Sequence, residues 1–223
     1  MTQRRKVVVF DLDDTLYKEI DFLKSAYRHI ASLVSNVNAP EKDVYQLMIE
    51  TYQKGGNAFE TVVQKYKFRL FSVQWMLGVY RNHKPYISLD DDTRNTLDQL
   101  KANGVTIGLI SDGRQMQQQN KVDALGLETY MDKSDIIIND KEERHKPDIR
   151  SFRTFVDKYG KGCDYWYVGD NTKKDFKGPN NLGWSTVCLL NDGRNIHPQD
   201  FDHLPSILPK YRINKMSDIL SIV

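Results

Sequence analysis

The chain has 223 residues, which suits one domain with an insertion or two small domains and is enough to bury a sizeable core. With 39% hydrophobic and 28% charged residues, it has the composition of an ordinary globular protein, not of a disordered or membrane protein. The 32 Lys and Arg nearly cancel the 30 Asp and Glu, and the basic residues are scattered, so a nucleic-acid partner is not expected.

Neither the N-terminus nor the cysteines suggest export. "MTQRRK" resembles the basic start of a signal peptide, but only "VVVF" follows before the first acids, which is too short for an export core. No stretch has the apolar length needed to span a bilayer, so no membrane partner is expected. Cys163 and Cys188 lie in or beside apolar runs, which favours buried thiols over a disulfide. The expected location is cytoplasmic.

The first predicted element is a strand at residues 6–12, an apolar run that ends in acids. After Tyr17 the apolar periodicity becomes helical and stays so until about residue 85. Helices are predicted over about 20–33, from Pro40 to about 48, and from Phe59 to Tyr80. No strand-like alternation interrupts this region, so we expect an all-helical insertion.

Beyond Pro85, strands and helices alternate along the chain. The predicted elements are a helix at 88–104, a strand at 105–113, a helix at 114–125, a strand at 135–140, a helix at 148–159, a strand at 165–170, a helix at 173–182 and a strand at 185–190. A loop at 191–210, a strand at 211–213 and a helix capped by Asn214 follow. This alternation predicts an α/β fold with a Rossmann-like parallel sheet and helices on both faces. Residues 1–16 with 86–223 would form its catalytic core, and residues 17–85 a helical cap.

Acidic and polar residues stand where the predicted strands end. Asp11, Asp13 and Asp14 crowd three mutually repelling carboxylates after the first strand, and alternation directs Asp14 away from the other two. In open α/β sheets, ligands bind at the carboxyl ends of parallel strands, so these ends are expected to meet. The other strand ends carry Ser111, Asp112, Gly113, Lys146, Gly169 and Asp170, with Asp175 a few residues on. Such a set suits a hard dication and a phosphate, and we expect Mg²⁺ as the cofactor.

Four motifs at these strand ends carry a family resemblance. They are "VVVFDLDDTL" (7–16), "TIGLISDG" (106–113), "HKPD" (145–148) and "GDNTKKD" (169–175). In type and order they make the chain resemble the haloacid dehalogenase-like hydrolases, of the phosphatase type with an inserted helical (C1-type) cap. The resemblance covers the sheet-forming part of the chain, whereas the helical insertion matches the family's cap in position and helical type only.

The resemblance implies phosphoryl transfer through a covalent intermediate. Asp11 would be the nucleophile that attacks phosphorus to give an aspartyl-phosphate. Asp13 would protonate the leaving oxygen and later take a proton from the attacking water, while Thr15 would orient the Asp13 region. A second acid at position 13 points to phosphate ester hydrolysis, because a halide leaving group needs no proton.

The resemblance also implies which residues hold phosphate and metal. The phosphate would be bound by Ser111, Asp112 and Lys146. The metal ligands would be Asp11, the backbone carbonyl of Asp13, and Asp170. Asp175 would have a supporting role, either reaching the metal through water or positioning Lys146.

Each of these residues also has a structural interpretation. Asp13 and Asp14 could cap helices, Ser111 could lie in a turn, Lys146 could be a solvated charge, and Asp170 could start a helix. The joint occurrence of all of them at strand ends favours the functional interpretation.

Two other classes of function remain open from the residues. A phosphomutase or phosphotransferase would pass the aspartyl-phosphate to a second hydroxyl. A signalling receiver would require a phospho-accepting Asp on a strand about fifty residues after the first acids, and residues 55–66 offer none. The presence of Asp11, Asp13, Lys146 and Asp170 argues against a catalytically silent binding module on the same fold. The prediction is therefore a Mg²⁺-dependent phosphatase for a small phosphorylated metabolite. The sequence makes no prediction of oligomeric state.

Overall fold

The computed structural model describes residues 4–223 and divides into two compact units. The first unit joins the N-terminal segment, up to Glu19, to Ser88–Val223, and the second is Ile20–Ile87. The sequence-based boundaries were 17 and 85, and the role of the second unit as a cap stays a prediction. The first three residues of the predicted core lie outside the described residues.

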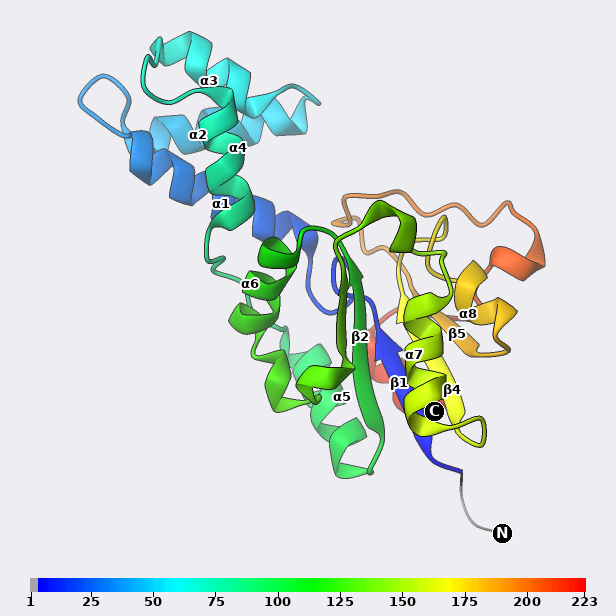
Figure 1. Cartoon of the computed structure of the whole chain (residues 1–223). Coiled ribbons are helices and arrows are strands. Elements are labelled where there is room, and N and C mark those ends of the chain that lie inside the picture. The colour runs from blue at the N-terminus through cyan, green and yellow to red at the C-terminus, as the bar shows by residue number, and fades with distance from the viewer. Residues whose placement is uncertain (1–3) are drawn as a thin grey trace. The chain divides into compact units, whose positions relative to one another are not determined.

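The first unit is built on a parallel sheet of 6 strands in the order β3-β2-β1-β4-β5-β6 (Figure 1). The strands are β1 (Lys6–Phe10), β2 (Thr106–Asp112), β3 (Ile136–Asn139), β4 (Asp164–Gly169), β5 (Ser185–Leu189) and β6 (Tyr211–Ile213). β1 lies between β2 and β4, and its residues Val7 to Phe10 are fully buried. A run of apolar β-formers is thus explained by burial on both faces of a parallel sheet.

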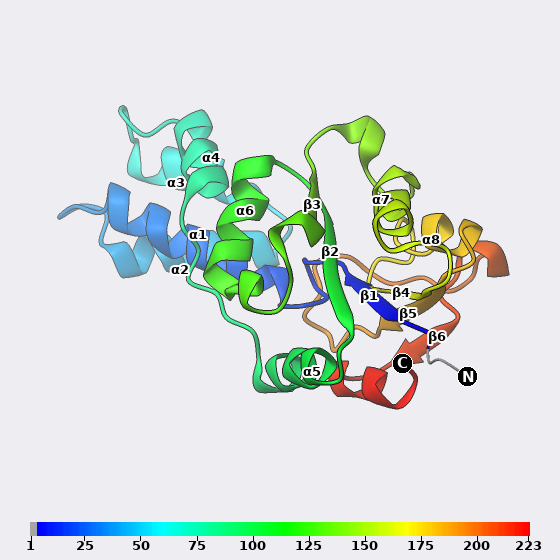
Figure 2. The ribbon, with the colours of Figure 1, turned by 60° about the horizontal axis from the view of Figure 1, so that its bottom comes forward.

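Helices cover both faces of this sheet. Figure 2 shows α7 and α8 on one face and α5 on the other. The helices of this unit are α5 (Asp91–Ala102), α6 (Gln115–Leu125), α7 (Arg150–Tyr159) and α8 (Lys177–Asn181). On α7, Phe152 packs edge-to-face against Tyr167 and Trp184, with ring centroids 5.0 and 5.5 Å apart. The predicted α/β fold, with a Rossmann-like parallel sheet, is confirmed.

The second unit contains helices only, and it has a separate apolar core. Its helices are α1 (Glu19–Val34), which starts one residue earlier in the first unit, α2 (Glu41–Gln53), α3 (Ala58–Tyr66) and α4 (Val73–Asn82). The single helical stretch predicted from Phe59 to Tyr80 is wrong, because α3 ends at Tyr66. Lys67 follows in a left-handed conformation with φ 52°, and Ser72 caps α4 by accepting a hydrogen bond from Trp75 N (3.1 Å).

Two further elements differ from the sequence-based expectation. The helix predicted over 173–182 is confined to α8, because turns occupy the residues before it. The C-terminal helix is a 3₁₀ helix at Met216–Ser221, and its first turn is capped by the Asp218 carboxylate, which accepts hydrogen bonds from Asn214 N and Lys215 N. Within the described residues, no helix is both long enough and apolar enough to cross a bilayer.

Candidate active site

Two carboxylates that follow β1, those of Asp11 and Asp14, lie in different surroundings. Asp11 N donates to Val168 O (2.8 Å), which extends the pairing with β4 and brings the Asp11 side chain to the carboxyl edge of the sheet. Asp14 has a φ of 55°, and its carboxylate accepts hydrogen bonds from Glu19 N (2.9 Å) and Ile196 N (2.8 Å). Asp14 therefore has a structural role, since it caps the start of α1 and holds the loop that contains Ile196.

Lys146 lies fully buried between two carboxylates. Its Nζ is 2.5 Å from Asp11 Oδ1 and 2.9 Å from Asp175 Oδ1, and it donates a hydrogen bond to the Tyr167 hydroxyl (2.8 Å). Burial raises the pKa of Asp11 to about 6, because desolvation outweighs the attraction of Lys146. The same carboxylates hold the pKa of Lys146 well above its usual value, despite burial. Lys146 is thus a permanent positive charge beside Asp11.

Asp170 joins this group from the end of β4. One carboxylate oxygen each from Asp11, Asp170 and Asp175 lie within 4.8 Å of one another. Burial, followed by the charges of Asp175 and Asp11, raises the pKa of Asp170 to about 9. Gly169 is required here, since a Cβ at that position would lie 2.5 Å from Asp175 Oδ2. Three crowded oxygen ligands that repel one another when ionised fit a hard divalent cation.

The Asp13 carboxylate lies in a different set of contacts. Lys121 Nζ is 2.7 and 2.9 Å from its two oxygens, Tyr17 OH donates to Oδ1 (2.5 Å), and Gln118 Nε2 donates to Oδ2 (2.9 Å). Burial alone would raise the pKa of Asp13, but Lys121 and these hydrogen bonds outweigh it and lower that pKa. The side chain is still 21% exposed, so it lies at the rim of the group.

The remaining predicted site residues, Ser111, Asp112 and Thr15, differ in their contacts. Ser111 is buried, and its Oγ accepts a hydrogen bond from Gln118 Nε2 (2.6 Å). The Asp112 carboxylate accepts hydrogen bonds from Lys146 N (3.2 Å) and Asn139 Nδ2 (3.0 Å), so it braces the segment that carries Lys146. Thr15 is buried, and its hydroxyl has no hydrogen-bond partner within residues 4–223. Phosphate binding by Asp112 and orientation of Asp13 by Thr15 stay predictions.

Sequence reasoning missed several neighbours of these acids. Asn195 Nδ2 donates to Asp170 Oδ2 (3.0 Å), and Gln199 Nε2 donates to the Asp170 carbonyl (2.8 Å), both from the loop predicted at 191–210. Gln118 and Lys121 come from α6, where they occupy buried positions beside Val122. Gln118 and Lys121 share a helical spacing with Val122 and Leu125, which is a signal for burial, but nothing in the sequence indicates their partners.

Known proteins resemble this chain in sequence and in fold. The family model described as haloacid dehalogenase-like hydrolase matches residues 8–189. Glyceraldehyde 3-phosphate phosphatase of Methanocaldococcus jannaschii is 27% identical, covering 98% of this chain and 96% of its own length. The protein of the same name from Pyrococcus furiosus is 28% identical, covering 83% of this chain and 80% of its own.

Among solved structures, the HAD-hydrolase YfnB from Bacillus subtilis, bound to magnesium, matches 99% of both chains with a TM-score of 0.63 and 17% identity. At that identity the likeness concerns the fold. The family match spans the ends of β1, β2 and β4, where the acids and Ser111 stand, and it includes Lys146. The resemblance drawn from the four motifs is confirmed, and the chain belongs to the haloacid dehalogenase-like hydrolases.

Proposed function

We propose that this protein is a Mg²⁺-dependent phosphatase that hydrolyses glyceraldehyde 3-phosphate, or a small phosphate ester close to it, through an aspartyl-phosphate. The observation that carries the proposal is the buried Lys146, whose Nζ pairs with Asp11 while Asp170 and Asp175 crowd the same point. Such a concentration of buried charge costs stability and is typical of catalytic sites.

Asp11 is the nucleophile of the first step. A bond forms between its carboxylate oxygen and phosphorus, and the bond from phosphorus to the ester oxygen of the substrate breaks. Asp13 gives a proton to that leaving oxygen, a step that requires the bound phosphate anion to raise the pKa of Asp13 from its lowered value in the free protein. In the second step, water attacks phosphorus, Asp13 takes a proton from the water, and the Asp11 carboxylate is released. Asp11 is only 4% exposed, which limits access of water before the phosphoryl group arrives.

Positive charge stabilises the transferring group in this mechanism. Lys146 offsets negative charge on the phosphoryl oxygens, and Ser111 is the hydroxyl that binds one of them. Lys174, which lies 3.5 Å from Asp112 and is 35% exposed, adds a second cation near the same acids. Lys146 and Lys174 are thereby suited to bind a phosphate ester, which carries negative charge before the reaction starts.

Magnesium would be held by Asp11, Asp170 and the backbone carbonyl of Asp13, with Asp175 in support. When bound, it would neutralise the approach of the substrate anion to the carboxylates and orient the phosphate. The fit depends on the crowding of three acid oxygens within 4.8 Å and on the raised pKa of Asp170, because both signal repulsion that a divalent cation removes.

The substrate proposal draws on the relatives. Two archaeal proteins that cover most of this chain carry the name glyceraldehyde 3-phosphate phosphatase. A family member could instead transfer the phosphoryl group to a second hydroxyl, as a mutase does. Release of inorganic phosphate from glyceraldehyde 3-phosphate without any added acceptor distinguishes hydrolysis from such transfer.

The test is a phosphate-release assay on the purified protein with Mg²⁺, across glyceraldehyde 3-phosphate and a panel of other small phosphate esters. Asp11→Asn should lower turnover roughly 10³-fold or more, the order expected when a covalent nucleophile is lost. Asp91→Asn is the matched control, because Asp91 is 93% exposed on α5, and it should leave turnover unchanged. Full activity of Asp11→Asn, or activity in excess chelator, would refute the proposal.

A further inference from the structure

One helix carries charge and polarity on the face that other helices use for apolar packing. The buried residues of α6 are Gln118, Lys121, Val122 and Leu125, spaced as one helical stripe. The Lys121 side chain is only 1% exposed. Burying an ammonium group is costly unless it is paired with a negative charge. The partner of Lys121 therefore indicates what this buried lysine does.

The partner is the Asp13 carboxylate, and the contact is made to both of its oxygens. Lys121 Nζ lies 2.7 Å from Oδ1 and 2.9 Å from Oδ2. Tyr17 OH adds a hydrogen bond to Oδ1, and Gln118 Nε2 adds one to Oδ2. Each oxygen thus has two donors, which fixes the rotation of the carboxyl group as well as its position.

The same helix also reaches the second motif. Gln118 Nε2 donates to Ser111 Oγ (2.6 Å) as well as to Asp13. One turn of α6 therefore links the acid that follows β1 to the hydroxyl on β2, although the two are about a hundred residues apart in sequence. An arrangement of this kind sets the distance between two groups that must act on the same phosphate ester.

We propose that Lys121 is a positioning residue, which holds the Asp13 carboxyl group in the orientation needed for proton transfer to and from the reacting oxygens. The inference rests on the proposed function, since it assigns Asp13 the acid–base role. Lys121 acts through Asp13 and has no contact with the substrate in this proposal. A misplacement of a reacting group by about 1 Å can cost roughly 10²-fold in rate, so loss of Lys121 should be visible in turnover.

The experiment is a double-mutant cycle on turnover with Lys121→Met, Asp13→Asn and the double variant, using glyceraldehyde 3-phosphate. Lys121→Met should lower kcat roughly 10- to 100-fold and leave KM within about 3-fold. In the Asp13→Asn background, replacing Lys121 should cause no further loss beyond about 2-fold, because a positioning residue has nothing left to position.

Lys158→Met is the matched control. Lys158 Nζ pairs with Asp135 Oδ1 at the same 2.7 Å, outside the group of catalytic acids, and its loss should leave kcat unchanged. A second substrate, p-nitrophenyl phosphate, adds a readout that a merely structural lysine would not move. Its leaving group needs no proton, so Lys121→Met should keep a rapid burst of nitrophenol and slow only the steady state, where Asp13 activates water.

Each other outcome counts against the inference. An unchanged kcat in Lys121→Met, an effect confined to KM, or a full additional loss in the Asp13→Asn background would overturn it. If Lys121→Met does not fold, Lys121→Gln takes its place. A lysine variant that folds only when Asp13 is also replaced would make the pair structural and overturn the inference. A wild-type protein without phosphatase activity sinks both proposals, whereas an active one with normal Lys121→Met sinks this one alone.

Discussion

Both ends of the six-stranded sheet gather charged side chains, but they hold them in opposite ways. At the carboxyl end, Lys146 is 0% and Asp11 4% exposed, and they pair directly. At the amino end, Arg4 and Asp164 form a longer pair with 71% and 45% of their side chains exposed. A cavity of about 490 Å³, lined by Arg4, Arg5 and Lys6 among others, nevertheless lies at the amino end.

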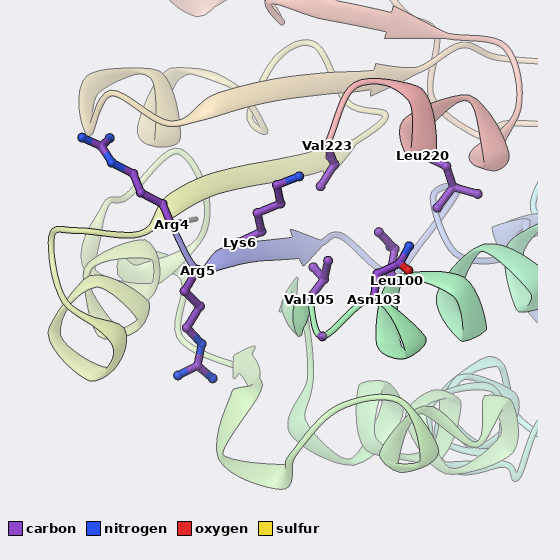
Figure 3. Close-up of a pocket in the computed structure, with 9 residues that line it drawn as sticks. Arg4, Arg5, Lys6, Leu100, Asn103, Val105, Leu220 and Val223 are labelled. Atoms are coloured by element: carbon purple, nitrogen blue, oxygen red, sulfur yellow. The ribbon is translucent and has the colours of Figure 1, made fainter. Parts of the chain in front are cut away.

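The proposed active site thus lies at the opposite end of the sheet from this positively charged cavity. Figure 3 shows the guanidinium groups of Arg4 and Arg5 directed away from Val223, while Lys6 extends toward it. Arg5 is engaged by Thr106 Oγ1 (2.9 Å) and by the Tyr159 ring. These cations do not converge, whereas Lys146 meets several acids in a buried space. Desolvated charge costs stability and is typical of functional sites, which supports the proposed site at the carboxyl end.

Replacing Lys146 by Met should cause the largest loss of stability and turnover. A small loss would contradict the contrast between buried charge at the carboxyl end and exposed charge at the amino end. Without the ammonium group, Asp11 and Asp175 stay buried without their shared cation. The free energy of unfolding should fall by about 3–5 kcal/mol, and kcat by roughly 10²-fold or more. Urea denaturation and phosphate release measure the two.

Lys158→Met is the control for this prediction, since Lys158 is 35% exposed and pairs with Asp135. Its loss should cost less than about 1 kcal/mol. Equal destabilisation by the two substitutions would mean that burial does not distinguish the carboxyl end.

Replacing Gly169 by Ala should have the next largest effect. The added Cβ would lie 2.5 Å from Asp175 Oδ2, so the side chain that holds Lys146 must move. We expect a loss of about 1–3 kcal/mol in unfolding free energy, together with weaker Mg²⁺ binding measured by calorimetry. Gly162→Ala is the control, because a Cβ there meets nothing within 4 Å. Normal Mg²⁺ affinity in a folded Gly169→Ala would contradict the expectation.

The pH dependence of stability sharpens the comparison further. The pKa of Asp170 is raised from 3.8 to about 9, first by burial and then by Asp175 and Asp11. Between these two values the folded state keeps a proton that the unfolded chain releases, so the free energy of unfolding falls as pH rises through this window. Without metal, Asp170→Asn should accordingly become more stable than wild type across this window.

At pH 8, an advantage of about 1 kcal/mol would raise the melting temperature of Asp170→Asn by roughly 2–4 °C over metal-free wild type. Added Mg²⁺ should stabilise wild type more at pH 8 than at pH 5, because it binds the ionised carboxylates, and should stabilise the variant less. Thermal scans with Mg²⁺ and with chelator measure this. A wild type whose advantage over the variant grows with pH in chelator would contradict the sign.

The sequence could predict the carboxyl edge because its residues follow from strand periodicity. Asp11 and Asp170 come directly after or at the end of apolar strands, and a parallel sheet brings such ends together. The fold class follows from the same alternation of strands and helices. Side-chain alternation also predicted that Asp14 points away from Asp11, although it did not predict the left-handed backbone of Asp14.

The rest depends on contacts that local patterns do not carry. Lys121 could be recognised only as a polar residue on a helix, since nothing in its neighbours reveals that Asp13 lies opposite. Asn195 reaches Asp170 from a long loop whose path is set by tertiary contacts, such as Ile196 N with Asp14. The break after Tyr66 was missed because the aromatic residues keep helical spacing across it.

Replacing Arg4 by Ala at the amino end should give the smallest effect. Its pair with Asp164 spans 3.5 Å between two exposed side chains, so water and salt screen most of the attraction. The free energy of unfolding should change by less than about 0.5 kcal/mol, and kcat should stay at the wild-type value. Urea denaturation and phosphate release, run beside Lys146→Met, measure both ends on one scale. A several-fold loss of turnover in Arg4→Ala would give the amino-end cavity a part in function, and exposure could then no longer separate the two ends.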